Sequence, residues 1–283
     1  MPDITTGSPR VILITGASAG IGRAICSRLG VRGNQLVLAA RSVDGLQRVV
    51  GEVEAQGGSA VSVPTDVSDP NALESLVAEC LSRFGRIDVL INNAGVDCFA
   101  EFAELTTEQI LQTIETNLTG TILLTRMVIP HMLRQGVGSI VNMASTAGKH
   151  GPAFGAVYGA TKAGMIAFTQ GLRGEFHRQG IRVSVVCPGF TTQGGIYDRI
   201  VQSTGQGTPA LMGGTDAVHV AMAVESCIRS GVPEVIVNWP PMRPMFAICE
   251  MFPRLGELMI LAATRKFLKR IALGSRAGKV DRP

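Results

Sequence analysis

The sequence predicts an α/β fold built on a doubly wound parallel sheet, and three observations support this. Short apolar runs alternate with helical stretches from Val11 to Asn238 of the 283-residue chain. Most runs are apolar throughout, as strands are when helices cover both faces of a parallel sheet. No linker rich in proline, glycine or serine divides this span, so we expect one domain over residues 1–239 and a helical C-terminal extension over residues 240–283.

The alternating pattern gives the expected order of elements. We expect seven strands, at Val11–Thr15, Gln35–Ala40, Ala60–Val63, Ile87–Ile91, Ser139–Met143, Arg182–Cys187 and Glu234–Asn238. Helices are expected between them, among others at Gly20–Arg32, Val43–Gln56, Pro70–Phe84, Thr107–Leu133 and Val157–Gln179. Right-handed βαβ crossovers then place helices on both faces of the sheet. The stretch Thr191–Thr215 is rich in glycine, threonine and glutamine and has no clear period, which indicates a mobile binding loop.

The composition excludes several classes of protein. With 46% hydrophobic and 17% charged residues, the chain is an ordinary globule rather than a disordered protein. Six scattered cysteines without close pairs or metal-ligand spacing indicate reduced thiols in the cytoplasm and no metal site. No stretch approaches the roughly 18 apolar residues that a membrane-spanning helix needs, and no signal-peptide pattern opens the chain. The net charge of +4 is modest, and we expect no nucleic-acid partner.

The first chemical motif follows the first expected strand and opens the next helix. It reads Thr15-Gly16-Ala17-Ser18-Ala19-Gly20-Ile21-Gly22. The glycines permit a tight turn and a close approach of the backbone to a pyrophosphate, whose charge the helix N-terminus stabilises. A glycine turn can also be a simple connection between a strand and a helix. Its place in the first βα unit favours a cofactor site that includes Gly16, Ser18, Ala19, Gly20, Ile21 and Gly22.

The residues after the second expected strand bear on the choice of cofactor. The acid that would hold the ribose hydroxyls of NAD, roughly 20 positions beyond the glycine motif, is missing, and Arg41-Ser42 stands there instead. A guanidinium can pair with the 2′-phosphate of NADP through two hydrogen bonds; the alternative is a solvated surface arginine. We predict NADP(H), held mainly by Arg41 with help from Ser42, and keep NAD(H) as the alternative.

Two further strand ends are expected to border the cofactor. Asp66-Val67 closes the third strand, where a side chain can meet the adenine ring. Asn92-Asn93-Ala94-Gly95 ends the fourth strand, where small residues let the backbone pass close to the cofactor. We therefore expect Asp66 and Val67, and then Asn93, Ala94 and Gly95, to line the cofactor site.

A tyrosine and a lysine four residues apart can share one face of a helix. Tyr158 and Lys162 have this spacing, and Ser145 ends the fifth strand upstream of them. A nearby ammonium favours the phenolate, so we expect Lys162 to lower the pKa of Tyr158 from about 10 toward the working range. Ser145 can hydrogen-bond a substrate oxygen as charge develops on it. The pair alone is commonplace in helices; together with the glycine turn and the serine it indicates acid/base catalysis.

These motifs together resemble the short-chain dehydrogenase/reductase family, from Val11 to about Asn238. The matching residues are Thr15, Gly16, Gly20 and Gly22 for the glycine motif TGxxxGxG, Asn92 to Gly95 for NNAG, Tyr158 and Lys162 for YxxxK, Ser145 for the catalytic serine, and Asn117 for a helix-borne asparagine. The resemblance implies a Rossmann-type fold and hydride transfer between a nicotinamide cofactor and a carbonyl or alcohol.

The resemblance also implies residue roles. Asn117 would hold a water that joins Lys162 to a proton relay, and Lys162 would also bind the nicotinamide ribose. The family commonly has a threonine four positions after the Pro-Gly pair, but here Pro188-Gly189 is followed by Phe190, Thr191, Thr192 and then Gln193. We expect Pro188 and Gly189 to border the cofactor, and either Thr191 or Thr192 to make the contact. The glycine turn lacks the basic residue of many NADP-using relatives, so the NADP prediction depends on Arg41.

The expected substrate pocket is mostly apolar. By analogy of position, its residues are Val96, Phe99, Ala147, His150, Phe154, Phe190 and Tyr197. His150 could take part in catalysis, but because the catalytic roles are already filled we favour a residue at the rim. Such a pocket suits a small hydrophobic carbonyl compound or its alcohol.

The extension is basic and amphipathic. Nine basic and three acidic residues lie from Pro240 onward, and apolar residues follow a helical spacing that Pro253 divides into two helices. The helices can pack on the protein or on a sister subunit. Alternatively, they can contact a membrane surface, with the apolar face among the headgroups and the basic residues on anionic phosphates. We favour packing and keep peripheral membrane contact as the second interpretation.

The sequence therefore predicts an NADP(H)-dependent oxidoreductase that interconverts a hydrophobic ketone or aldehyde and its alcohol, with Tyr158 as the general acid or base. The rival interpretation is a non-catalytic dinucleotide-binding redox sensor, which would need the glycine turn but not Asn117, Ser145, Tyr158 and Lys162 together. The candidate substrates are β-ketoacyl thioesters, steroids and sphingoid ketones. We expect a homodimer or homotetramer.

Overall fold

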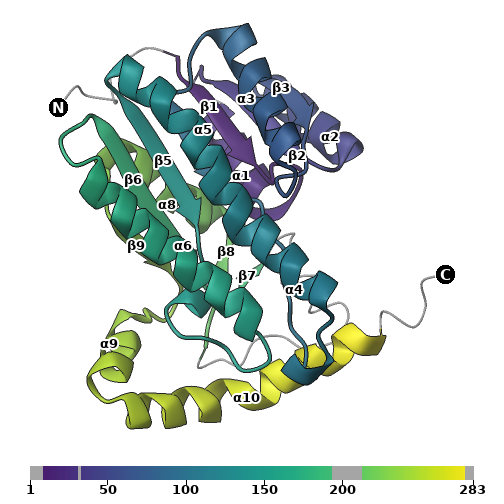
Figure 1. Ribbon diagram of the computed structural model, residues 1–283, viewed down its shortest axis with the longest axis vertical. Coiled ribbons are helices and arrows are strands. Elements are labelled where there is room, and N and C mark those ends of the chain that lie inside the picture. The colour runs from purple at the N-terminus through teal and green to yellow at the C-terminus, as the bar shows by residue number, and fades with distance from the viewer. Residues whose placement is uncertain (1–8, 31–32, 193–211, 278–283) are drawn as a thin grey trace.

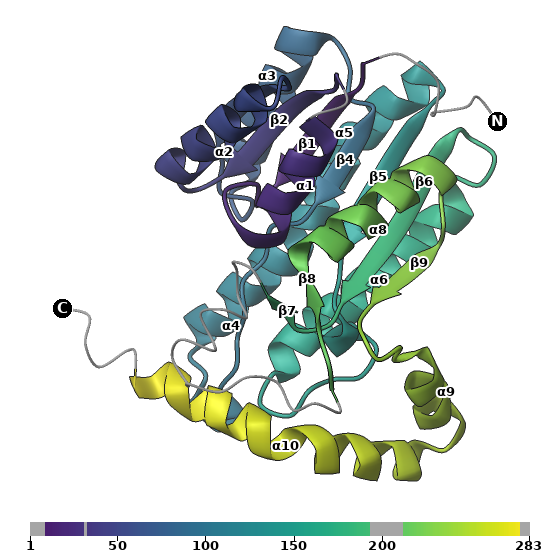
Figure 2. The same cartoon turned by 180° about the vertical axis from the view of Figure 1, so that it is seen from behind.

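The computed structural model describes residues 9–30, 33–192 and 212–277. Seven parallel strands form one sheet in the order β3-β2-β1-β4-β5-β6-β9, with helices on both faces (Figures 1 and 2). This confirms the predicted fold class.

The strands of the main sheet are β1 (Val11–Thr15), β2 (Gln35–Ala40), β3 (Ser59–Pro64), β4 (Val89–Asn92), β5 (Gly138–Met143), β6 (Ile181–Pro188) and β9 (Glu234–Val237). The helices are α1 (Gly20–Gly30), α2 (Val43–Ala55), α3 (Pro70–Phe84), α4 (Thr107–Ile114), α5 (Gly120–Gln135), α6 (Ala156–Glu175), α8 (Ala217–Ser230), α9 (Arg243–Met251) and α10 (Pro253–Ala277). Two short strands, β7 (Thr191–Thr192) and β8 (Thr215–Asp216), pair in parallel beside the sheet.

Alternate residues of each strand enter opposite cores, because side chains of a strand point to opposite faces in turn. Ile12 and Ile14 of β1 pack with α1, α2 and α8, which cover the face seen in Figure 2. Val11 and Leu13 pack with α3 and α5, on the face seen in Figure 1, where α6 also lies. Both faces are therefore apolar, which explains the continuous apolar runs in the sequence.

The predicted helix Thr107–Leu133 is interrupted. The chain forms α4, then a π-helical turn at Glu115–Thr119, and only then α5. The extra residue of a π-turn cannot be recognised from apolar spacing, and such turns are frequent at functional sites. Asn117 lies within this turn.

The strand order places a crevice at the carboxyl ends of β1 and β4. From β1 the chain continues to β2 and β3 on one side, and the later strands β4, β5, β6 and β9 follow on the other. At such a switch point the connections leave in opposite directions, and ligands of open α/β sheets bind there.

The C-terminal extension forms two helices separated at Pro253, as expected. Figures 1 and 2 show α10 lying across the carboxyl end of the sheet, on the side where the crevice opens. Phe267, Leu268 and Ile271 of α10 are buried against Phe99, Phe154, Phe190 and Met212. Part of the extension therefore packs on the protein, which agrees with the interpretation that we favoured from the sequence.

Two further expectations concern particular segments. Only the ends of the predicted loop Thr191–Thr215 can be compared, and they form β7 and β8; residues 193–211 lie outside the described residues. Over the described part of the chain, no helix combines the length and the apolar character needed to cross a bilayer.

A buried polar network joins the strands beneath the crevice. The amide of Asn92 donates to Thr125 Oγ1 and Asn142 Oδ1, at 3.0 and 2.8 Å, and the amide of Asn142 donates to Thr169 Oγ1 at 2.9 Å. Each member of the network is nearly inaccessible to solvent. Buried amides are tolerated when their donors are paired, and they are costly when one partner is removed.

We predict that Thr169→Val lowers the free energy of unfolding by about 1–3 kcal/mol, because the isosteric valine leaves an Asn142 donor buried without an acceptor. Ser139→Ala, on the strand that carries Asn142, is the matched control. Ser139 Oγ is buried and has no hydrogen-bond partner among the described residues. Its loss should therefore cost little or stabilise the fold. Urea unfolding of the three proteins measures both effects, and equal losses in the two variants would contradict this account.

Candidate active site

The glycine turn after β1 has the backbone that its sequence requires. Gly16 and Gly20 have φ of +65° and +54°, a region that favours glycine. At Gly22 a Cβ would overlap the carbonyl oxygen of Gly16. The turn can therefore present its backbone closely to a ligand at the start of α1.

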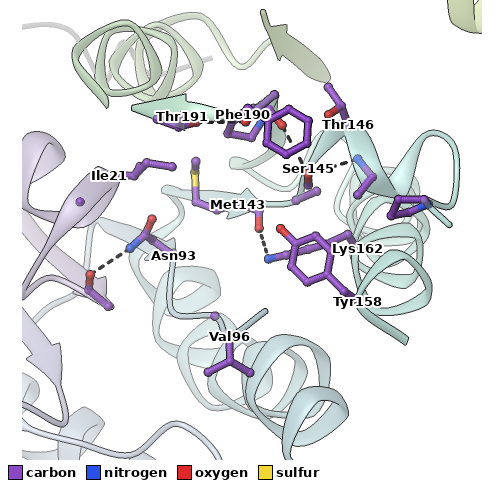
Figure 3. Close-up of a pocket in the computed structure, with 18 of the residues that line it drawn as sticks. Ile21, Asn93, Val96, Met143, Ser145, Thr146, Tyr158, Lys162, Phe190 and Thr191 are labelled. Carbon is purple, nitrogen blue, oxygen red and sulfur yellow. Dashed lines mark hydrogen bonds between the residues drawn. The ribbon is translucent and has the colours of Figure 1, made fainter. Parts of the chain in front are cut away.

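Asn93 holds the glycine turn against the end of β4. Its amide donates to the carbonyl oxygens of Thr15 and Gly16, at 3.0 and 3.1 Å (Figure 3). In return, Thr15 Oγ1 accepts from the backbone N–H groups of Asn93 and Ala94, at 3.0 and 3.1 Å. These bonds fix the two sides of the crevice relative to each other.

Arg41 and Asp66 lie at the ends of β2 and β3 and line the same cavity. Arg41 is exposed. Burial alone would raise the pKa of Asp66, but two hydrogen bonds from Ser68 and the charge of Arg41 hold it below its usual value. Ser42 caps α2 by accepting from the N–H of Gly45, at 3.1 Å. The expected basic group is thus in place at the tip of β2.

Tyr158, Lys162 and Ser145 come together at the end of the sheet (Figure 3). Tyr158 and Lys162 share a face of α6, and the Lys162 Nζ lies 5.8 Å from the centre of the Tyr158 ring. The ammonium donates to the carbonyl oxygen of Met143, at 2.8 Å. Ser145 Oγ accepts from the N–H of Ala147, at 3.1 Å, and hydrogen-bonds Tyr158.

The expected shift of the tyrosine pKa is wrong in direction. Burial raises the pKa of Tyr158 to about 12, and the hydrogen bond with Ser145 is the smaller, lowering effect. The charge of Asp97 raises it further. Burial also lowers the pKa of Lys162 to about 8. Helical spacing predicted the two side chains on one face, but it could not show that the phenol is buried, so that desolvation raises its pKa. Near neutral pH Tyr158 is therefore a protonated phenol that can give a proton.

Asn117 is buried beside this cluster, behind the cavity wall. Its side chain accepts from the N–H of Val96, at 2.7 Å, and donates to the carbonyl oxygen of Val96, at 2.9 Å. It also reaches Thr161 Oγ1, at 3.3 Å. In the structure Asn117 therefore fixes the segment that follows β4 against α6.

The cavity has a volume of about 1130 Å³, which is large for a single small ligand. The expected cofactor-site residues that line it are Gly16, Ser18, Ala19, Gly20, Ile21, Gly22, Arg41, Ser42, Asp66, Val67, Asn93, Ala94, Gly95, Tyr158, Lys162, Pro188, Gly189 and Thr191. The expected pocket residues that line it are Val96, Phe99, Ala147, His150 and Phe190. Ser145 lines it as well.

Of the residues expected in the cofactor site and the substrate pocket, two do not line the cavity and a third cannot be compared. Thr192 is exposed and bonds to the carbonyl oxygen of Thr215, at 3.3 Å, so Thr191 is the threonine that faces the cavity. Phe154 packs under α10 and lines a smaller, separate hollow. Tyr197 lies outside the described residues.

Sequence reasoning missed one wall of the cavity. This wall is formed by residues of the extension: Pro240, Pro241, Met242, Met245, Phe246, Met259, Ile260, Ala263, Thr264 and Leu268. The apolar helical spacing indicated that the extension packs on something, but spacing alone could not show that it faces the active site. The described residues contain no group of three His, Cys, Asp or Glu that could hold a metal ion.

The proteins and solved structures that this chain is similar to include reductases and a short-chain oxidoreductase. Ketoacyl reductase HetN of Nostoc sp. is 40% identical over 238 residues, which is 84% of this chain and 82% of HetN. A 3-oxoacyl-(acyl-carrier-protein) reductase of Synechocystis sp. is 38% identical over 188 residues, 66% of this chain and 76% of that protein. The crystal structure of an actinorhodin polyketide ketoreductase with NADPH has a TM-score of 0.76 and 34% identity, covering 81% of this chain and 96% of that one.

A metagenomic short-chain oxidoreductase in complex with NADP has a TM-score of 0.71 and 33% identity, covering 81% of this chain and 97% of that one. The model of the short chain dehydrogenase family matches residues 10–199, which include the glycine turn, Asn117, Ser145, Tyr158 and Lys162. The same segment builds the crevice and the cluster described above, and on this ground the chain is an oxidoreductase that belongs to the short-chain dehydrogenase family.

Proposed function

We propose that the protein uses NADPH to reduce the 3-oxo group of an acyl thioester with an apolar chain. One observation carries this proposal. The cluster of Ser145, Tyr158 and Lys162 lies where the crevice beside the glycine turn meets an apolar pocket walled by α9 and α10. A redox sensor would need the crevice but neither the cluster nor the apolar wall.

The residues present fit an NADP(H) cofactor. Gly16, Gly20 and Gly22 allow the tight turn at the start of α1, where backbone N–H groups can meet a pyrophosphate. Arg41 lies exposed at the tip of β2, where a 2′-phosphate needs a cation. Two similar structures were solved with NADPH or NADP. Asp66 and Val67 would border the adenine, and Thr191 the nicotinamide.

The chain's own residues would perform the proton chemistry. When bound, the cofactor supplies a hydride to the carbonyl carbon. Tyr158, held protonated by burial, donates its proton to the carbonyl oxygen, and Ser145 hydrogen-bonds the same oxygen. Lys162, which Met143 holds in place, binds the nicotinamide ribose and keeps a positive charge close to the tyrosine. Asn117 acts as a positioning residue through Val96 and Thr161.

The apolar wall supports an extended substrate. Met212, Met242, Met245 and Met259 line this side of the cavity. Methionine side chains are flexible and adapt to ligands of different shape. The similar proteins are named ketoacyl reductases, which favours an acyl thioester over a steroid or a sphingoid ketone.

The substrate prediction is tested by following NADPH oxidation with 3-oxoacyl thioesters of increasing length, a ketosteroid and a sphingoid ketone. We expect kcat/KM for the thioesters to rise about fourfold with each buried methylene until the pocket is full. A ketosteroid turned over with higher kcat/KM than every thioester would overturn the thioester assignment.

Neighbouring alanines on α10 give a matched pair for the same assay. Ala263 lines the cavity, whereas Ala262 is exposed and does not. Ala263→Phe should lower kcat/KM about tenfold for long thioesters but hardly for short ones, because the ring occupies the space of the chain's end. Ala262→Phe should change neither. Equal effects of the two variants would mean that α10 does not bound the substrate.

Tyr158→Phe should lower kcat by about 100- to 10,000-fold, because only the proton-donating oxygen is lost. NADPH binding, measured by fluorescence titration, should be retained. A similarly active Tyr158→Phe enzyme would end the case for Tyr158.

Arg41→Asp should shift the ratio of kcat/KM for NADPH to that for NADH by about 100-fold toward NADH, because it removes a phosphate partner and adds repulsion. Arg48→Asp is the matched control, since Arg48 is an exposed arginine on α2 outside the cavity. A parent enzyme that prefers NADH, or equal shifts in both variants, would refute the role of Arg41.

A further inference from the structure

Helix α10 carries two different stripes on opposite sides. One stripe is buried and consists of Gly256, Ile260, Thr264, Phe267 and Ile271, which recur with the spacing of one helical face. It packs on the body of the protein and on the cavity. Structural packing therefore accounts for this stripe, but not for the other.

The opposite stripe is exposed and is not polar throughout. Its residues are Leu255, Leu258, Ala262, Arg265, Lys266, Lys269 and Leu273, which also recur with helical spacing. Leu258 is 65% exposed. At the turn from α9 into α10, Met251 and Phe252 are 70% and 56% exposed.

The outward side thus has two parts. The apolar corner consists of Met251, Phe252, Leu255 and Leu258, where α9 meets α10. The basic end consists of Arg265, Lys266 and Lys269, further along α10. Figures 1 and 2 show that the corner of α9 and α10 projects away from the sheet. Contiguous exposed apolar side chains of this kind mark interaction sites.

The charges indicate what covers this side. A two-fold interface between copies of the chain would place the basic end against another basic end or against the partner's apolar corner, where only Glu250 and Glu257 of α9 and α10 could pair with its three cations. An anionic lipid surface suits both parts, because its acyl chains can contact the apolar corner and its phosphates can pair with the basic end. The acidic residues on these helices are Glu250 and Glu257. Glu257 precedes Leu258 by one position and so points about 100° away from it.

We propose that the outward side of α9 and α10 docks the protein on an anionic lipid surface, with the apolar corner among the headgroups and the basic end on the phosphates. The inward sides of the same helices line the cavity through Met245, Phe246 and Ile260. Docking therefore sets the apolar wall of the active site beside the bilayer. The proposal does not depend on the identity of the substrate.

The test is flotation of the full protein with vesicles of phosphatidylcholine alone and of phosphatidylcholine mixed with phosphatidylglycerol, at low and high salt. We expect flotation with the mixed vesicles, little with the neutral ones, and a loss at high salt because salt screens the basic end. Leu255→Glu/Leu258→Glu should abolish flotation, and Lys266→Glu/Lys269→Glu should weaken binding at least tenfold.

Matched controls change equivalent residues elsewhere. Leu111 is a half-exposed leucine on α4, and Arg48 and Arg126 are exposed arginines on α2 and α5. Leu111→Glu and Arg48→Glu/Arg126→Glu should float as the parent does. Melting temperature and NADPH oxidation with a short, soluble ketone confirm that each variant is folded. Should the leucine variant fail to fold, flotation of the lysine variant still tests the proposal.

Two results would overturn the proposal. One is the absence of flotation for well-folded parent protein. If the parent protein is then an oligomer in size-exclusion chromatography and the leucine variant is a monomer, the corner is an interface between copies of the chain. The other is equal loss of binding in the control variants. Under the first result, binding of an acidic carrier protein to the basic end would replace the lipid surface by a protein partner.

Discussion

The hydrogen bonds that join the glycine turn to the end of β4 are the constraint on which the site depends. We call this set of bonds the joint. Asn93 donates to two carbonyl groups of the turn, and Thr15 accepts from two N–H groups after β4. Because the strand order reverses between these two strands, the joint holds open the crevice that the reversal creates. Arg41 then lies on one side of this crevice and Tyr158 on the other.

Much of the fold and the site could be predicted because their signals are local. The limits of β1, β2 and α3 follow directly from the apolar runs, the glycine turn and the helical stretch that opens at Pro70. The features that sequence could not give depend on contacts between distant segments. Examples are the π-turn that carries Asn117, the choice between Thr191 and Thr192, and the wall that α10 adds to the cavity.

The tyrosine illustrates how burial changes an inference from spacing. Helical spacing brings Lys162 to the same face as Tyr158, and charge attraction alone would lower the pKa of the phenol. The fold instead directs the ammonium to Met143 and surrounds the phenol with apolar groups such as Phe99, whose ring lies 5.7 Å away. The result is a phenol that is protonated near neutral pH and can donate a proton.

The extension links the active site to the outside of the molecule, since one side of α10 bounds the cavity and the other faces away. The central claim is that this cavity brings the 3-oxo group of an acyl thioester to Tyr158 beside the nicotinamide. Its most direct test uses NADPH carrying deuterium on the transferable face of nicotinamide C4. Mass spectrometry should find one deuterium at C3 of the 3-hydroxyacyl product. A hydroxyacyl product without deuterium, or no product from any thioester, would contradict the account.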